Sequence, residues 1–182
     1  MRFEFSAGGI VFKKKGNKEE ILKRVQDDIK ILVCQHSQHH GWVFPKGLIN
    51  TERTEKSTER KYSVSSVNSS VSSVVARETK EEAALREVKE ETGISGKIIK
   101  PLTLITYWYK LNNEKIKKTV YYFLMEYLSG DTKDHDFEME NVEWLPINKV
   151  EERLTYKSDK EVWKQAREKI LNLKHQISNK SQ

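Results

Sequence analysis

The sequence has few of the features that would place a protein outside the cell or in a membrane. It contains a single cysteine, Cys34, which excludes an internal disulfide and is typical of proteins in a reducing cytoplasm. No apolar run approaches the roughly 18 residues needed to cross a bilayer. Polar residues and glycines interrupt the apolar positions at the N-terminus, unlike the layout of a signal peptide. We therefore expect a cytoplasmic protein with no membrane partner, in which Cys34 is buried in a strand rather than catalytic.

Composition adds a weak indication of the partner. The sequence is 36% hydrophobic and 33% charged, which predicts a soluble globular protein, and 182 residues are most simply one domain with a substantial core. The formal net charge of +6 and the pI near 9.2 suit a nucleotide, a nucleic acid or a phosphorylated metabolite. The basic residues are dispersed, so charge alone does not choose among these partners.

Apolar runs separated by turn residues predict a set of strands. Asn112 and Asn113 separate the two longest runs, which predicts an antiparallel hairpin. The stretch 41–47 reads as a short aromatic strand that runs into a Pro/Gly turn, and the stretch 13–30 as a polar connection. The expected strands are 3–13, 29–36, 41–47, 97–110, 116–130 and 142–146.

Two helices are well marked. The first has a capping box formed by Thr79 and Glu82 and stops at Gly93. Its apolar residues Ala84 and Val88, supplemented by Leu85, are expected to face a core. The second starts at Ser158 with a further capping box to Glu161, and residues 179–182 form a frayed tail. Its buried stripe is expected to comprise Val162, Ala166, Ile170, Leu173 and Ile177, with Trp163 in the core.

Residues 50–77 differ from their surroundings. The stretch is rich in threonine and charge and then consists almost entirely of serine and valine. Serine and valine are middling helix formers, so we interpret the segment as a flexible insertion, an inert surface loop rather than a functional lid.

Three acids lie close together at the end of the first helix. Glu87, Glu90 and Glu91 stand at positions i, i+3 and i+4, so their carboxylates share one face. Two such charges repel by roughly 3 kcal/mol, and the negative end of the helix adds to that cost. Water could solvate the acids, as it does on many charged helices. A hard cation such as Mg²⁺ would relieve both penalties, and Arg86 could orient one of the carboxylates.

Taken together, these residues resemble the Nudix hydrolase family, whose signature is G-x5-E-x7-R-E-U-x-E-E-x-G-U. Glu78 and the run 86–94, "REVKEETGI", match every fixed position of its second part. The plausible signature glycine is Gly47, and the 30 residues 48–77 follow it where the signature has five, an insertion of 25. The resemblance implies an α+β fold, a mixed β-sheet sandwiched between helices, in a single domain over 1–178.

The resemblance also implies roles for individual residues. Glu87, Glu90 and Glu91 would be metal ligands together with the Gly47 carbonyl, and the metal would be Mg²⁺, or Mn²⁺ in its place. Glu87 could alternatively activate water as a general base, and Arg86 would orient a glutamate. A further glutamate six residues before Trp144 would be Glu138, with Glu140 as its rival.

Within the family, the chain looks most like the diadenosine tetraphosphate hydrolases, which split their substrate asymmetrically to ATP and AMP. Adenine needs an aromatic face and a polyphosphate needs cations. Alternation along two paired strands suggests Tyr107, Tyr109 and Tyr122 for the base, and Lys46 and Lys118 for the phosphates. His39 and His40 are expected to be solvated loop residues.

Two alternatives remain open. One is another Nudix activity, on nucleoside triphosphates or on RNA 5′-triphosphate ends, the one way in which we expect a nucleic acid as partner. The other is a binding module without catalysis. The complete set of signature acids argues against that module, which has no need of three mutually repelling carboxylates.

Overall fold

The structure is a computed structural model that describes residues 1–14, 29–50 and 77–178, with side chains as far as residue 173. Residues 15–28 of the expected polar connection, residues 51–76 of the expected insertion, the tail 179–182 and the side chain of Ile177 therefore lie outside the described residues. Within the described ranges, no helix is both long enough and apolar enough to cross a membrane.

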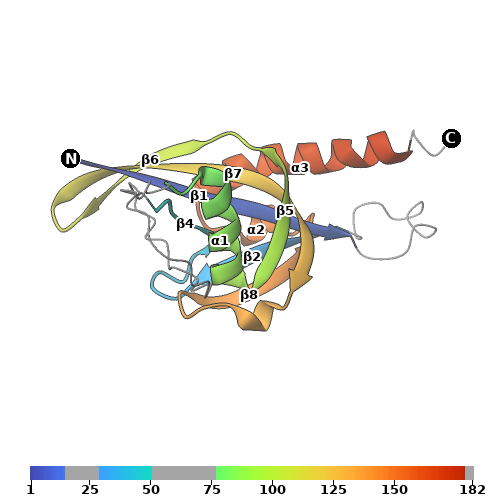
Figure 1. The fold of residues 1–182 in the computed structure, drawn as a ribbon, viewed down its shortest axis with the longest axis horizontal. Helices are drawn as coiled ribbons and strands as arrows, with labels where there is room; N and C mark the ends of the chain where they lie inside the picture. Colours follow the sequence, from blue (N-terminus) through green and yellow to red (C-terminus); the bar gives the residue numbers. More distant parts are fainter. Residues whose placement is uncertain (15–28, 51–76, 179–182) are drawn as a thin grey trace, which may run out of the picture.

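The described chain consists mostly of strands, with the helix α1 between β4 and β5 and the longest helix, α3, at the end (Figure 1). The elements, in chain order, are β1 Arg2–Lys14, β2 Ile29–His36, β3 Trp42–Val43, β4 Lys46–Leu48, α1 Lys80–Thr92, β5 Ile94–Pro101, β6 Ile105–Leu111, β7 Glu114–Gly130, the short 3-10 helix η1 Thr132–Asp134, β8 Met139–Pro146, α2 Val150–Arg153 and α3 Lys157–Ser178.

Strands β1 and β7 form the spine of a mixed sheet. They pair in parallel from Arg2 opposite Ile116 to Phe12 opposite Glu126. The other edge of β1 pairs antiparallel with β2 and β4, and the other edge of β7 with β5 and β6. Strands β3 and β8 extend the sheet beyond β2. The mixed sheet inferred from the sequence is confirmed.

Alternation along the strands divides the buried side chains between the two faces of the sheet. On one face, Ile10, Leu124 and Phe44 pack with Trp163 and Ala166 of α3. On the other, residues of β1 and β7 pack beneath α1; this second core includes Ala7, Val11, Met125, Ala84 and Val88. The sheet therefore lies between α1 and α3 (Figure 1), which confirms the expected order of layers.

Several local expectations are confirmed. Asn112 and Asn113 have positive φ values of 48° and 63° and connect β6 to β7 in an antiparallel hairpin. Cys34 is fully buried in β2, and burial raises the pKa of its thiol well above the ordinary value. Trp163 is only 1% exposed. These features depend on local sequence signals and on simple burial.

Other expectations are wrong. Leu85 is 37% exposed and does not face the core, because Ala83 rather than Leu85 completes the buried side of α1. Gly47 lies in strand β4, paired with Ala7, and not in a turn. Helix α3 begins at Lys157, so Ser158 lies inside its first turn, where its hydroxyl donates to Asp159 instead of capping the helix.

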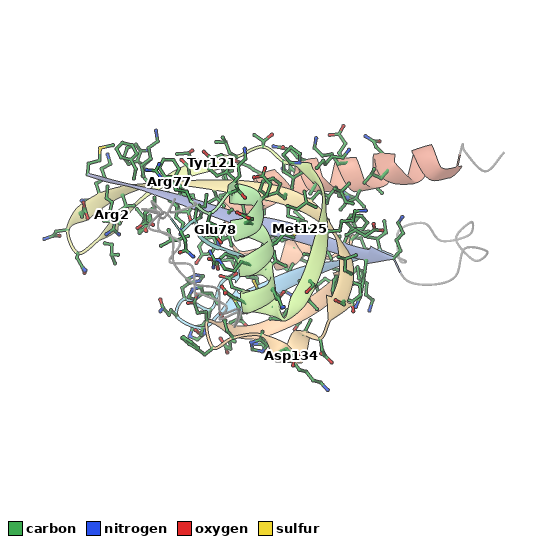
Figure 2. All side chains as sticks on the ribbon, viewed as in Figure 1. Arg2, Arg77, Glu78, Tyr121, Met125 and Asp134 are labelled. Carbon is green, nitrogen blue, oxygen red and sulfur yellow. The ribbon has the colours of Figure 1, made fainter. Side chains whose placement is uncertain are left out.

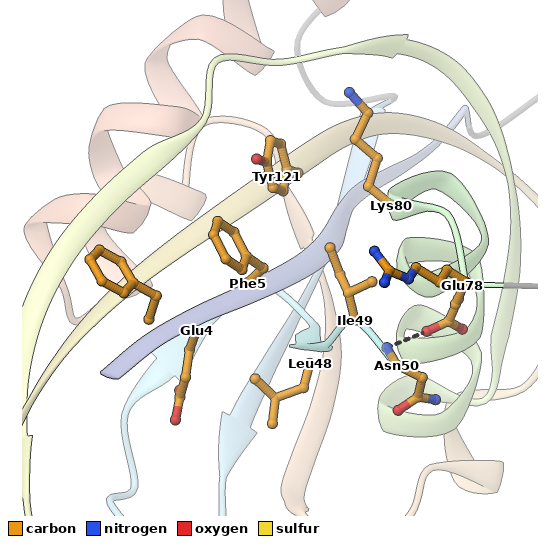
Figure 3. A pocket seen from close by; sticks show the side chains of 10 residues that line it. Glu4, Phe5, Leu48, Ile49, Asn50, Glu78, Lys80 and Tyr121 are labelled. Atoms are coloured by element: carbon orange, nitrogen blue, oxygen red, sulfur yellow. Dashed lines mark hydrogen bonds between the residues drawn. The ribbon is translucent and has the colours of Figure 1, made fainter. Parts of the chain in front are cut away.

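One region of the sheet is covered by none of the helices that the structure describes. Arg77 and Glu78 lie at the start of α1, whereas Asp134 lies beyond its other end (Figure 2). Beside the start of α1, a cleft of about 460 Å³ opens over β1 and β4 (Figure 3). Phe3, Phe5 and Tyr121 are among the residues that line it.

Candidate catalytic site

The sequence positions the end of α1 firmly. Thr79 caps the helix by accepting a hydrogen bond from the Glu82 N–H, and the Glu82 carboxylate accepts from the Thr79 N–H. Gly93 ends it with a left-handed φ of 72°, and a Cβ there would lie 2.2 Å from the Asp131 carbonyl oxygen. With Ala84 and Val88 buried, the last turn presents its glutamates on the neighbouring side, toward β4.

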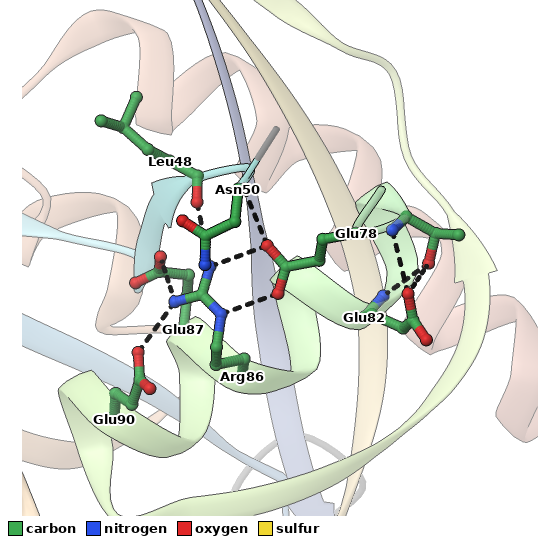
Figure 4. Close-up of polar contacts among 8 residues, drawn as sticks. Leu48, Asn50, Glu78, Glu82, Arg86, Glu87 and Glu90 are labelled. Carbon is green, nitrogen blue, oxygen red and sulfur yellow. Dashed lines mark hydrogen bonds and ion pairs between the residues drawn. The ribbon is translucent and has the colours of Figure 1, made fainter. Parts of the chain in front are cut away.

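Arg86 organises the carboxylates on this side of α1 (Figure 4). Its Nη1 lies 2.7 Å from Glu87 Oε1 and 2.8 Å from Glu90 Oε2. Its Nε and Nη2 donate to the two oxygens of Glu78 at 2.7 and 3.0 Å, and Nη2 also donates to the Leu48 carbonyl at 2.9 Å. These bonds raise the pKa of Arg86, the one to Glu78 most of all. Arg86 therefore orients two of the three acids, not one.

Glu87 lies against the backbone of Gly47. A Cβ at residue 47 would be 2.0 Å from Glu87 Cδ, so the absence of a side chain on Gly47 makes room for the carboxylate. Partial burial raises the pKa of Glu87, while the hydrogen bond from Arg86 opposes that rise. A carboxylate with a raised pKa is a better proton acceptor, as a general base requires.

Glu91 is the most deeply buried of the three acids. It is 5% exposed, and its Oε2 accepts a hydrogen bond of 2.8 Å from the Lys46 N–H. Burial raises the pKa of Glu91 to about 8, against the opposing effect of the Lys46 charge. A buried carboxyl of this kind needs a cation or a proton for compensation.

The late glutamates differ in their surroundings. Glu138 is exposed in the turn before β8, and its negative charge adds to the burial effect that raises the pKa values of Glu87 and Glu91. Glu140 instead lies 2.6 Å from His40 Nδ1. Of the two candidates, Glu138 therefore lies where its charge acts on the other acids.

The carboxylates of Glu87, Glu90 and Glu91 are ligands of the kind that a hard divalent cation prefers. In the described part of the chain, no three acidic, histidine or cysteine side chains already surround one point. The reason is visible in the contacts: Glu87 and Glu90 turn toward Arg86, and Glu91 toward the Lys46 N–H. The buried carboxyl of Glu91 and the crowding of like charges are nevertheless the conditions that a cation with carboxylate ligands would relieve.

A second group of predicted residues lies around Lys46, whose backbone N–H donates to Glu91. Burial lowers the pKa of Lys46, but the stronger combined attraction of Asp159 and Glu91 leaves that pKa raised. Burial and the Lys46 charge lower the pKa of Lys118, which faces Tyr107 across β6 and β7. Burial also raises the pKa of the Tyr107 hydroxyl, opposed by Lys46. The structure thus brings Lys46, Lys118 and Tyr107 into one electrostatic environment.

Tyr109 is close to this group but already has a polar partner. Its ring centroid lies 6.3 Å from that of Tyr107, and its hydroxyl donates to Glu4 at 2.6 Å. Burial, together with the Glu4 hydrogen bond, raises the pKa of Tyr109 to about 12.

Tyr122 does not join the other tyrosines. Its ring is 1% exposed in the core beneath α3, with an edge-to-face contact to Phe44. Its hydroxyl donates to Asp159 at 3.2 Å. The expectation that Tyr122 meets a substrate base is therefore wrong for the structure described, because the strand turns this side chain into the packed interior.

The sequence analysis missed Asp159 and the aromatic neighbours of His39. Asp159 is 3% exposed, and burial raises its pKa against the charge of Lys46. His39 stacks on His36 at 4.3 Å, and Tyr156 Oη lies 3.0 Å from His39 Nδ1. Burial lowers the pKa values of His36 and His39, and the Lys46 charge contributes. The available signal was position: Asp159 lies in the first turn of α3, His36 ends β2, and His39 and Tyr156 lie in the connections next to these elements.

Comparisons with known proteins agree on one family. A family model described as the NUDIX domain matches residues 21–166. The mutator protein MutT4 of Mycobacterium tuberculosis (strain CDC 1551 / Oshkosh) is 40% identical over 93 residues, which are 51% of this chain and 38% of that protein. The chain thus spans less than half the length of this relative.

Solved structures share the fold at low sequence identity. A C. elegans Ap4A hydrolase binary complex aligns with a TM-score of 0.55 and 17% identity, covering 93% of this chain and 98% of that one. The NUDIX domain of Shewanella oneidensis NrtR, complexed with ADP ribose, aligns with a TM-score of 0.58 and 18% identity, covering 93% and 90%. The MutT protein of Methanosarcina mazei Go1 aligns with a TM-score of 0.58 and 17% identity, covering 92% of this chain and 95% of that one.

Proposed function

Because this chain belongs to the NUDIX family, we propose that it is a divalent-cation-dependent pyrophosphohydrolase, folded as one domain over 1–178, that splits diadenosine tetraphosphate asymmetrically into ATP and AMP. The observation that carries the proposal is the arrangement at the end of α1. Arg86 holds Glu87 and Glu90, Gly47 makes room for Glu87, and buried Glu91 faces Lys46.

The residues that would hold the cation are Glu87, Glu90 and Glu91, with the Gly47 carbonyl and Glu138. A bound Mg²⁺ or Mn²⁺ neutralises phosphate oxygens and lowers the pKa of a bound water. Glu87 is our candidate to take the proton from the attacking water, because partial burial raises the pKa of its carboxyl. Arg86 keeps the carboxylates oriented through its fork of donors.

The preference for a dinucleoside polyphosphate is supported by the sheet side of the site. Lys46 and Lys118 would balance the charge of the phosphate chain, and Tyr107 would offer its ring to a base, with Tyr109 beside it. The C. elegans structure with the same fold is of an Ap4A hydrolase. Tyr122 has no part in this proposal because it is buried.

A second candidate activity is the cleavage of nucleoside triphosphates, including RNA 5′-triphosphate ends. The relative that matches over 93 residues is named a mutator protein. A panel of diadenosine tetraphosphate, nucleoside triphosphates and 5′-triphosphorylated RNA, assayed with and without Mg²⁺, separates the two. ATP and AMP as paired products from the first substrate support our choice. Inactivity on diadenosine tetraphosphate, together with rapid cleavage of triphosphates, overturns the proposed activity.

Catalysis itself is tested by removing one charge at a time. Glu91→Gln and Glu87→Gln keep the shape of the site and remove a carboxylate. We expect each to lower kcat by at least about 100-fold in saturating Mg²⁺. Exposed Glu152 on α2 provides a matched control, since Glu152→Gln removes the same charge outside the site. Unchanged turnover in both site variants would overturn the metal mechanism, whereas no turnover by the unaltered protein on any substrate of the panel would favour a binding module without catalysis.

A further inference from the structure

Four aromatic rings lie on the face of the sheet that carries α1, beside the start of that helix. Phe3 and Phe5 of β1 are 56% and 48% exposed, and Trp108 of β6 is 47% exposed. Tyr121 of β7 belongs to the same side and lines the cleft with Phe3 and Phe5. We call Phe3, Phe5, Trp108 and Tyr121 the aromatic face.

The pairing of the strands fixes how these rings are arranged. Phe3 and Trp108 both lie opposite Lys117 of β7, so they occupy one row across three strands, about 10 Å apart. Phe5 is two residues from Phe3 and therefore about 7 Å farther along. Figure 3 shows the rings of Phe5 and Tyr121 on the same side of β1, near Lys80. This spacing suits several planar groups in succession.

Lysine side chains lie beside two of these rings. Lys80 Nζ lies 5.3 Å from the Tyr121 ring centroid, and Lys115 and Lys117 lie 4.6 and 5.6 Å from that of Trp108. Arg77 lines the cleft at its edge. We call Arg77, Lys80, Lys115 and Lys117 the basic rim. The surface therefore combines ring faces with positive charge beside Tyr121 and beside Trp108.

Negative charge is scarce on this surface. The outward strand positions 3, 5, 106, 108, 110, 115, 117, 119 and 121, all described, carry no Asp or Glu. Two acids line the cleft, and both have cationic partners: Glu4 pairs with Arg2, and Glu78 with Arg86. Two copies of this face would set like charges against each other, whereas a polyanion would complement it.

From these observations we infer that the aromatic face and the basic rim bind single-stranded nucleic acid. Stacking on exposed rings accepts any base, and lysines beside the rings meet the phosphates, which is how sheet surfaces hold single strands. Duplexes hide their base faces and fit such a surface less well. The site lies on the side of the sheet that carries α1, whereas Tyr107 and Lys118 face the other side.

The test uses fluorescence anisotropy of a labelled oligouridine of about 12 nucleotides with a 5′-hydroxyl end. The full chain is kept in EDTA, so the result is independent of the hydrolase proposal. We expect binding at low salt that weakens as salt rises. Phe5→Ala and Trp108→Ala should each weaken it by about tenfold, whereas Trp108→Phe should restore it because a ring remains.

Lysine variants separate this surface from general positive charge. Lys115→Ala with Lys117→Ala should lower the slope of log K against log salt by about 1.4, or about 0.7 for each lysine. Lys149→Ala with Lys164→Ala removes the same charge from exposed lysines elsewhere and should leave binding nearly unchanged. The inference would be overturned if this control lost as much binding, or if the protein did not bind the oligouridine at low salt. It would also be overturned if a duplex bound equally tightly, or if binding were unchanged after both ring truncations. Dimers in gel filtration that Trp108→Ala abolishes would assign the face to a second copy instead.

Discussion

The carboxylate of Glu87 occupies the space that a side chain at residue 47 would fill. The two residues come from α1 and β4, and a Cβ on Gly47 would lie 2.0 Å from Glu87 Cδ. Arg86 holds Glu87 from the other side at 2.7 Å. The carboxylate therefore cannot move aside freely, and this packing leads to the first prediction.

Gly47→Ala should displace Glu87 while leaving the sheet intact, because β4 pairs with β1 through its backbone. A displacement of about 1 Å in a catalytic group costs about 100-fold, so we expect kcat to fall by that order. Gly96→Ala provides a matched control in β5, where the nearest atom to the new Cβ would be Met125 Cβ at 3.2 Å and the three nearest atoms include no carboxylate. Comparable kcat values for the two variants, measured in saturating Mg²⁺, would contradict a role for this contact.

Binding of Mg²⁺ should release a proton at pH 7. Burial raises the pKa of Glu91 to about 8 in the cation-free protein, so the carboxyl is mostly protonated at pH 7. A ligand carboxylate must be deprotonated, so affinity should rise about tenfold per pH unit below that pKa and level off above it. Calorimetric titrations in buffers of different ionisation enthalpy measure the proton count. Glu91→Gln should abolish the release, and equal release by this variant would place the proton elsewhere.

The same raised pKa predicts how stability depends on pH without the cation. The folded state binds the Glu91 proton more tightly than the unfolded state, whose carboxyl titrates at about 4.3. The free energy of unfolding should therefore fall as pH rises from about 4.3 to about 8. Glu91→Gln removes this dependence, so its Tm in EDTA should exceed that of the wild type by a margin that grows with pH. A constant margin from pH 5 to pH 9 would contradict the assignment.

Tyr107 and Tyr122 should respond differently to substitution. Tyr107→Leu removes a ring beside Lys118 and should raise KM for diadenosine tetraphosphate by about tenfold, with a smaller change in kcat. Tyr122→Phe removes a donor to buried Asp159 and should lower the free energy of unfolding by about 1–3 kcal/mol. Steady-state kinetics and denaturant unfolding distinguish the two effects. An effect of Tyr122→Phe on KM alone would place its ring at the substrate.

Removal of residues 51–75 should leave a folded protein. The Asn50 N–H donates to Glu78 Oε2 at 2.8 Å, so the flanks of the segment meet without it. The deletion leaves five residues between Gly47 and Glu78, the signature spacing, and shortening the loop favours folding by about 1.6 kcal/mol. A Gly/Ser segment of equal length is the control for length. A large fall in Tm for both variants would show that the removed valines stabilise the fold.

The sequence by itself determined the features that depend on neighbours along the chain. The Thr79 and Glu82 capping box and Gly93 fix both ends of α1, and the i, i+3, i+4 spacing then sets the three acids on one side. Alternating strands and the Asn112–Asn113 turn predicted the hairpin. Each of these follows from the geometry of a few consecutive residues.

Only the tertiary structure decided which side chains meet across the chain. Tyr107 and Tyr122 follow the same alternation along the paired strands β6 and β7. In the folded protein, however, Tyr122 is buried and donates to Asp159, whereas Tyr107 lies opposite Lys118. The tertiary structure also turned Leu85 outward and gave Arg86 a second glutamate. The physical reason is that burial and ion pairing depend on elements far apart in sequence, such as β4, α1 and α3, and no local pattern records where those elements come together.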